Sequence, residues 1–125
     1  MRLLLDTHVV LWAVTEPERL SASTRAALVA PRNTLYLSAA SAWEMEIKRS
    51  LGKLETPASF DDELARLRLE ELPVRLTHTR LVRELPDHHE DPFDRLLIAQ
   101  ARAESLVLVT ADPAIRRYPV RTMAP

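Results

Sequence analysis

Four carboxylates occupy comparable places in this sequence, each where an apolar run meets a helix or a turn. Asp6 ends the apolar run RLLLD, and Glu44 lies six residues after Ser38. Asp94 precedes the apolar segment LLIAQA, and Asp112 lies two residues after the run LVLVT. Carboxylates gathered at one place repel each other unless a cation lies between them, and hard divalent cations such as Mg²⁺ and Mn²⁺ take oxygen ligands. The sequence therefore predicts a magnesium or manganese site, provided that the fold brings these four residues together.

Each acid, taken alone, also has a purely structural explanation. Asp6 could cap the helix that follows it, and Glu44 could pair with Lys48 one turn later. Asp94 could interact favourably with the dipole of its helix, and Asp112 could form a turn with the proline after it. The prediction of a metal site therefore depends on all four acids lying at one edge of the fold.

Strands and helices are expected to alternate around these acids. Near-continuous apolar strands are typical of a parallel sheet covered on both faces, and ligands of such a sheet bind beyond the carboxyl ends of its strands. The fold class is therefore α/β, with three layers and a central parallel sheet of four to five strands. The predicted strands are Arg2–Asp6, Thr34–Ser38, Leu72–Leu76, Leu106–Thr110 and Val120–Met123, and helices are predicted at 7–14, 22–30, 39–51, 59–71, 78–85 and from 92 onward.

The helix after the second predicted strand receives the most detailed prediction. It is expected to begin at Ser38 or at Ser41, since Ser41 and Glu44 fit a capping box, and to end at Gly52. One stripe of it is expected to face the core: Ala40, Trp43, Ile47 and Leu51. Asp91 is expected to cap the later helix that carries Asp94.

Several smaller polar groups are candidates for supporting the acids. Ser38, Ser41 and Thr110 could donate hydrogen bonds to them, with helix capping as the alternative for both serines. His8 is expected to take a hydrogen-bonded packing role. His88 and His89 could bind a metal but are expected to be solvated.

Composition sets further bounds. A chain of 125 residues suits one domain spanning residues 1–125. The absence of cysteine excludes disulfides and thiolate metal sites, and a single glycine excludes a glycine-rich phosphate loop. A net charge of -1 gives no general field that would attract nucleic acid. No apolar run approaches the ~18 residues of a membrane span, so a cytoplasmic location without membrane contact is expected.

Four blocks of the sequence together resemble the PIN-domain ribonucleases, and among them the VapC toxins of bacterial toxin–antitoxin pairs. The resemblance runs from Leu3 to about Ile115. The blocks are LLLDTHVVLW, SAASAWEMEIKRSLGKL, HHEDPFDRLLIAQA and LVTAD. The resemblance implies that the family's four acids correspond to Asp6, Glu44, Asp94 and Asp112, accompanied by Asp91. One departure is WEMEIK in place of the more usual WEIAIK, which adds Glu46 on a different side of the helix from Glu44.

The same resemblance implies a PIN-like fold and an endoribonuclease that depends on Mg²⁺ or Mn²⁺. The four acids would then be catalytic and would hold the metal. Lys48, Arg95 and Arg116 would contact RNA phosphates, and Thr110, Ser38 and Asp91 would support the acids. The resemblance further implies a homodimer and a VapB-like antitoxin, with a heterotetramer or larger assembly of the two.

Two rival functions remain open at this point. A phosphatase with an aspartate nucleophile after the first strand would place a second acid two residues later, where this chain has His8. A catalytically silent binding domain would keep the acids for structure alone. Phosphatase activity on a small phosphoester would favour the first, and metal-dependent RNA cleavage would exclude the second.

Overall fold

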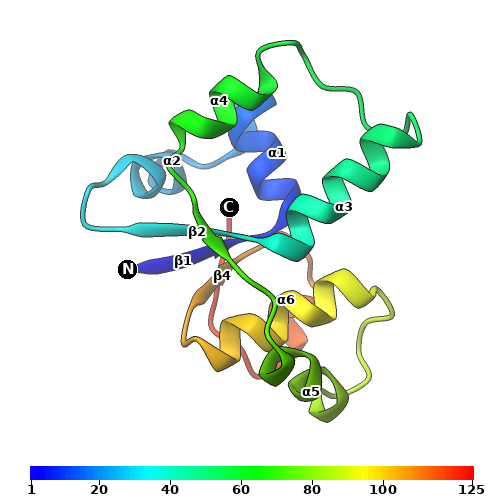
Figure 1. Cartoon of the computed structure of the whole chain (residues 1–125). Coiled ribbons are helices and arrows are strands. Elements are labelled where there is room, and N and C mark those ends of the chain that lie inside the picture. Colours follow the sequence, from blue (N-terminus) through cyan, green and yellow to red (C-terminus); the bar gives the residue numbers. More distant parts are fainter.

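A five-stranded sheet runs through the computed structural model, which describes residues 1–125 (Figure 1). The strand order is β3-β2-β1-β4-β5, and every neighbouring pair is parallel. The strands are β1 (Arg2–Leu5), β2 (Thr34–Ser38), β3 (Glu70–Leu72), β4 (Val107–Val109) and β5 (Thr122–Met123). The α/β class and the five-stranded parallel sheet confirm the predicted fold.

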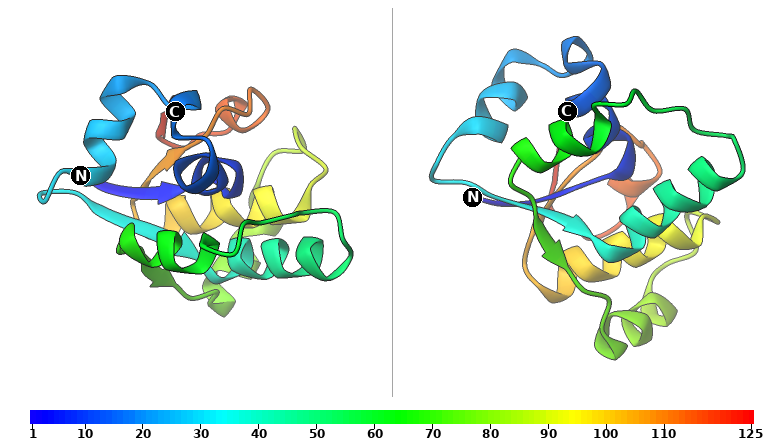
Figure 2. Two further views of the ribbon diagram at one scale, coloured as in Figure 1. Left: turned by 90° about the horizontal axis from the view of Figure 1, so that it is seen from above. Right: turned by 45° about the horizontal axis from the view of Figure 1, so that its top comes forward.

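Helices cover both faces of this sheet, so that three layers result (Figure 2). Helices α1, α2 and α4 lie on one side and helices α5 and α6 on the other (Figure 1). The helices are α1 (Thr7–Thr15), α2 (Ala22–Val29), α3 (Ala39–Ser50), α4 (Phe60–Arg66), α5 (Leu76–Glu84) and α6 (Pro92–Ala103), with short 3-10 turns at Pro17–Arg19 and Ile115–Arg117. None of the helices has the length and apolarity needed to cross a membrane.

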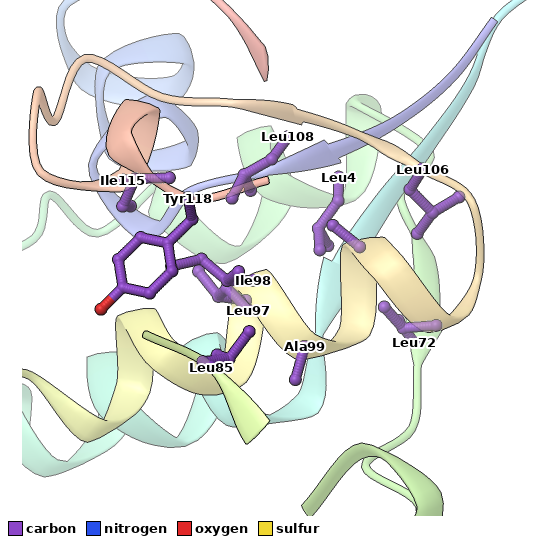
Figure 3. Packing of buried hydrophobic residues seen from close by; sticks show 11 residues of the cluster. Leu4, Leu72, Leu85, Leu97, Ile98, Ala99, Leu106, Leu108, Ile115 and Tyr118 are labelled. Atoms are coloured by element: carbon purple, nitrogen blue, oxygen red, sulfur yellow. The ribbon is translucent and has the colours of Figure 1, made fainter. Parts of the chain in front are cut away.

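The alternation of side chains along β1 divides the apolar core in two. Leu3 and Leu5 belong to a cluster with residues of α1 and α4, whereas Leu4 belongs to the cluster around α6. Successive residues of a strand point to opposite faces, so β1 is buried on both sides. In the second cluster Leu97 and Ile98 of α6 pack beneath the sheet (Figure 3). This double burial holds β1 between α1 and α4 on one face of the sheet and α6 on the other.

Helix α3 begins and ends at two of the predicted positions but faces a different way. Its N-cap is Ser38, whose hydroxyl accepts a hydrogen bond from the amide of Ala40, and Gly52 follows its end with φ +70°. The capping box at Ser41 is wrong, because Ser41 lies within the first turn and its buried hydroxyl has no partner.

The predicted apolar stripe of α3 is wrong at Trp43 and Leu51, whereas Ala40 is buried as expected. Trp43 is 64% exposed and Leu51 62% exposed, whereas Glu44 and Met45 are buried. Glu44 and Ala40 are both buried, since residues four apart share one face of a helix, so the buried face of α3 runs through Glu44 rather than through Trp43. An acid on the inner face is the clearest departure of this helix from ordinary amphipathic packing.

The segment from Ser59 to Leu76 differs most from prediction. The predicted helix over 59–71 ends already at Arg66, and the predicted strand over 72–76 lies instead at Glu70–Leu72. Arg68 turns the chain with φ 53°, after which Tyr36 to Ser38 pair with the edge strand β3. Pairing with β2 decides the conformation of this edge strand, and a stretch rich in glutamate and leucine carries little strand propensity of its own.

Candidate metal centre

The carboxyl ends of β1 and β4 place two of the predicted acids side by side. The strands are neighbours in register, with Leu5 opposite Val109, and Asp6 follows β1 directly. The amide of Asp6 donates to the carbonyl of Val109 at 3.0 Å. The Thr110 hydroxyl donates to Asp6 Oδ2 at 2.7 Å and accepts from the amide of Asp112 at 3.1 Å. Thr110 therefore links the first and the last acid.

Asp6 caps a helix and is also one of the acids at the edge of the sheet. Its Oδ1 accepts a hydrogen bond from the amide of His8 at 3.2 Å, so that it caps α1. Its side chain is buried at the sheet edge all the same. The ring of His8 is 65% exposed, so the packing role expected for it is wrong.

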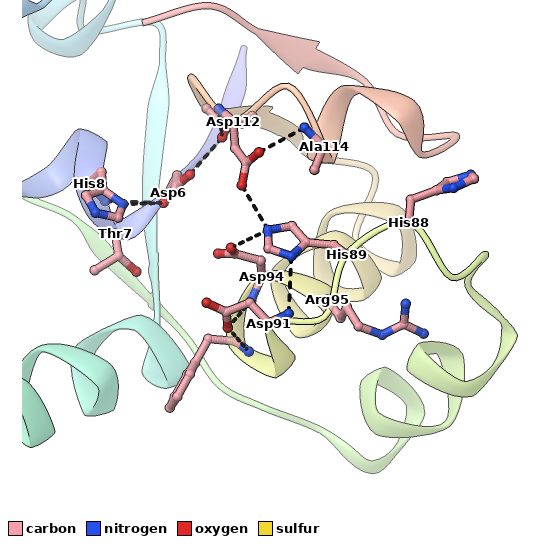
Figure 4. Close-up of polar contacts among 12 residues, drawn as sticks. Asp6, Thr7, His8, His88, His89, Asp91, Asp94, Arg95, Asp112 and Ala114 are labelled. Atoms are coloured by element: carbon pink, nitrogen blue, oxygen red, sulfur yellow. Dashed lines mark hydrogen bonds and ion pairs between the residues drawn. The ribbon is translucent and has the colours of Figure 1, made fainter.

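Asp94 lies in the first turn of α6, positioned by a proline and a second acid. Asp91 is the N-cap and accepts from the amides of Phe93 and Asp94 at 2.8 and 3.4 Å. Pro92 takes the first helical position, where no amide hydrogen is needed. The helix therefore starts where Asp94 is directed toward Asp6 and Asp112 rather than into solvent (Figure 4).

The surroundings of Asp94 strongly disfavour its negative charge. Burial and the charges of Asp6, Asp91 and Glu44 raise its pKa to about 7, against a lowering contribution from His89. A carboxylate whose pKa is raised by desolvation and by three like charges marks a place where an additional positive charge would be strongly bound.

His89 lies between two acids of the cluster, although its sequence context indicated a solvated loop. Its Nε2 is 2.9 Å from Asp94 Oδ2 and 2.9 Å from Asp112 Oδ2. Burial lowers the pKa of His89, but the hydrogen bond to Asp112 and the charges of Asp94, Asp112 and Asp91 outweigh it and raise the pKa above its usual value. The only sequence signal for this role is that His89 lies two residues before the N-cap.

Glu44 reaches the cluster from α3 and is held by two side chains. The Thr7 hydroxyl donates to Glu44 Oε1 at 2.8 Å, and Lys48 Nζ lies 3.4 Å from Oε2. The ion pair named above as the structural explanation of Glu44 therefore exists, and Glu44 faces the acids as well. Thr7 was missed in the sequence, although it directly follows Asp6.

The remaining predicted residues lie farther from the acids. Ser38 donates to the buried side chain of Gln100 at 2.6 Å and thus joins β2 to α6. Arg116 is exposed on the 3-10 turn at Ile115–Arg117. Arg95, predicted to contact RNA, is committed elsewhere: its guanidinium donates to the carbonyls of Val82 and Pro86 and to the Tyr118 hydroxyl. These bonds turn its guanidinium away from the carboxylates (Figure 4), and its contact with RNA stays a prediction.

The donors present here fit a hard divalent cation. Ligand atoms of His89, Asp94 and Asp112 lie within 4.8 Å of one another, and Asp6 and Glu44 are close enough to shift the pKa of Asp94. A cluster dominated by carboxylate oxygens suits Mg²⁺ or Mn²⁺ rather than a soft metal. Beside it lies an open hollow lined by Glu44, Ile47, Lys48, Glu90, Asp91, Pro92 and Phe93.

Solved structures share the architecture over nearly the whole chain. A chain of VapBC2 from Rickettsia felis, bound to a DNA fragment from its promoter, is 22% identical, with 99% of this chain and 98% of that chain covered and a TM-score of 0.78. A chain of DNA-bound VapBC from Salmonella typhimurium is 19% identical, with 99% and 98% covered and a TM-score of 0.66. A chain of FitAcB from Neisseria gonorrhoeae is 20% identical, with 97% and 96% covered and a TM-score of 0.66. At these identities the likeness is one of fold.

A comparison with protein families assigns the chain to a family. No curated protein matches the chain. The profile of the PIN domain matches residues 3–120, a range that contains all four acids. The chain therefore belongs to the PIN-domain family, which is a family of nucleases.

Proposed function

We propose that residues 1–125 form one PIN-like nuclease domain that hydrolyses RNA phosphodiester bonds with Mg²⁺ or Mn²⁺. The observation that carries this proposal is the gathering of acids at one edge of the sheet, where Asp6 and Glu44 are buried and Asp94 is partly buried among them. The same surroundings raise the pKa of Asp94 to about 7. Burying several like charges at one edge is costly for a fold. Such an arrangement is understandable if a cation and a phosphate are to be bound there.

Four acidic side chains would bind that cation. Asp6, Asp94, Asp112 and Glu44 would supply the oxygens. When bound, the cation would neutralise charge on the scissile phosphate and lower the pKa of an attacking water. The chain's own contribution is to keep the carboxylates oriented, through the hydroxyls that Asp6 and Glu44 accept from at 2.7 and 2.8 Å.

Binding of the substrate is proposed for basic side chains at the rim of the cluster. Lys48 is 40% exposed and lies beside Glu44, so its ammonium can reach a phosphate that approaches the acids. Arg116 is a second, more peripheral candidate because it is exposed close in sequence to Asp112. The open hollow between α3 and the start of α6 would accommodate the RNA backbone.

The likeness to VapBC and FitAcB chains supports a toxin of a VapC-like pair. We propose a homodimer that a VapB-like antitoxin inhibits, in a heterotetramer or a larger assembly. An acidic cluster on a chain of net charge -1 is a suitable target for a basic side chain from such a partner, since complementary charges favour association. The phosphatase alternative loses its support, because the PIN family match supplies a different use for the acids.

The deciding experiment is cleavage of total bacterial RNA by purified protein with Mg²⁺, with Mn²⁺ and with EDTA. Asp6→Asn and Asp94→Asn test the cluster, and Asp62→Asn on the exposed face of α4 is the matched control. Cation-dependent cleavage that both cluster variants lose and the control keeps would support the proposal. Cleavage that persists in EDTA, or in both cluster variants, would contradict it. Single-stranded DNA of matched length tests the choice of RNA.

A further inference from the structure

The imidazole of His89 joins two carboxylates that belong to different elements. Asp94 comes from α6 and Asp112 from the loop after β4, and Nε2 lies 2.9 Å from an oxygen of each. The side chain is only 19% exposed. A nitrogen in this position could act as a ligand of a cation or as a hydrogen-bond donor to the acids, and the other ring nitrogen distinguishes the two.

The amide of Asp91 donates a hydrogen bond to Nδ1 of His89 at 3.1 Å (Figure 4). Nδ1 must therefore present its lone pair, and the single proton of the neutral ring is on Nε2. Nε2 therefore faces the acids as a donor. Binding a cation through Nε2 would require the proton to move to Nδ1, where two N–H groups would face each other.

We infer that His89 is a positioning residue that donates its Nε2–H to Asp94 and Asp112 and is not itself a ligand of the cation. By bridging the two oxygens it holds carboxylates from α6 and from the β4 loop at a fixed spacing. Without it these two charges would repel each other and separate. The inference rests on the cation site of the proposed function, and it adds a residue that orients the ligands.

The neighbouring histidine offers a matched control. The amide of His88 donates to the Tyr118 hydroxyl at 3.0 Å, and its ring packs edge-on against that of Tyr118 with 5.2 Å between centroids. His88 points away from the acids (Figure 4). Its removal should leave the cation site unchanged.

Calorimetric titration of Mn²⁺ into four proteins tests the inference. His89→Ala should weaken binding by about 10–100-fold, the usual cost of losing a group that orients metal ligands. His89→Gln, whose amide N–H can donate from nearly the same place as Nε2, should recover most of the affinity. His88→Ala should bind like the wild type, and thermal unfolding confirms that each variant is folded. Unchanged or tighter binding by His89→Ala would overturn the inference.

Nitrogen NMR of the labelled ring gives a readout that does not depend on catalysis. Nδ1 should be the unprotonated nitrogen before and after addition of Mg²⁺. Transfer of the proton to Nδ1 on addition of Mg²⁺ would make His89 a ligand and overturn the inference. A wild type that binds no cation would sink the proposed function, whereas the ring of the cation-free protein would still report whether Nε2–H faces the acids.

Discussion

Asp94 lies where its own charge is unfavourable as long as no cation is bound. Its pKa is raised from 3.8 to about 7, so between these pH values the folded protein binds more protons than the unfolded chain. The free energy of unfolding therefore falls as pH rises through this window. The raised pKa of His89 acts in the same direction, since the stability it contributes in its protonated form is lost as pH rises through its folded pKa.

Replacing Asp94 by asparagine should therefore stabilise the protein in EDTA at pH 8. The gain should be on the order of 1–3 kcal/mol, because each unit of pKa shift corresponds to roughly 1.4 kcal/mol. At pH 5 the gain should shrink, because the wild-type carboxyl is then mostly protonated. Urea unfolding at both pH values measures this, with Asp62→Asn as the control. A gain that is absent at pH 8, or larger at pH 5, would contradict the explanation.

Individual residues differ in how far the sequence could predict them. Asp6, Thr110 and Asp112 could be placed, because they lie within three residues of the ends of two apolar strands. Asp94 could be placed because Asp91 and Pro92 mark the start of its helix. Thr7 and His89 could not, since their partners Glu44 and Asp112 lie 37 and 23 residues away. The bonds of Arg95 to two backbone carbonyls and to the Tyr118 hydroxyl could not be predicted either, because a carbonyl acceptor is not visible in the residue type.

At the scale of elements, the start of α6 positions the cluster most directly. Asp91 accepts from two amides of the first turn and its own amide donates to His89. Asp91→Ala should cost about 1 kcal/mol of stability through loss of the cap. It should also weaken Mn²⁺ binding, because Asp94 loses the side-chain cap that fixes the first turn of its helix.

The comparison variant for this prediction is Asp91→Ser, which keeps a capping oxygen. It should restore most of the stability measured by thermal unfolding. If Asp91→Ala and Asp91→Ser are destabilised equally, the side chain does not act as a cap. Ser21→Ala at α2 provides a second reference, since Ser21 accepts from the amide of Thr24 far from the acids.

The elements that the sequence predicted well are those with their own local signals. Strands β1 and β2 are centred on apolar runs, and α6 begins with an acid followed by proline. Strand β3 has exposed glutamates at Glu70 and Glu71 and forms because β2 lies beside it. The rotation of α3 could not be predicted, because it follows from the inward position of Glu44, which is set by the cluster as a whole.

At the scale of the whole molecule, two apolar clusters pack on the two faces of the sheet. Negatively charged side chains gather at one edge of the sheet. The net charge is only -1, so the repulsion is local and belongs to the cluster of Asp6, Glu44, Asp94 and Asp112. A cation that binds there stabilises the folded state alone, since the unfolded chain does not bring these residues together. Cation binding and global stability are thus linked.

Mn²⁺ should therefore raise the melting temperature of the entire domain. At a concentration of about 100 times Kd the gain is roughly 2.7 kcal/mol, equivalent to roughly 10 °C for a chain of this size. Asp6→Asn should lose most of this gain, because it removes a proposed ligand that connects β1 to the site. Differential scanning calorimetry with increasing Mn²⁺ measures the shift, and NaCl at equal ionic strength controls for screening. An equal shift in Asp6→Asn and wild type would mean that the cation binds elsewhere.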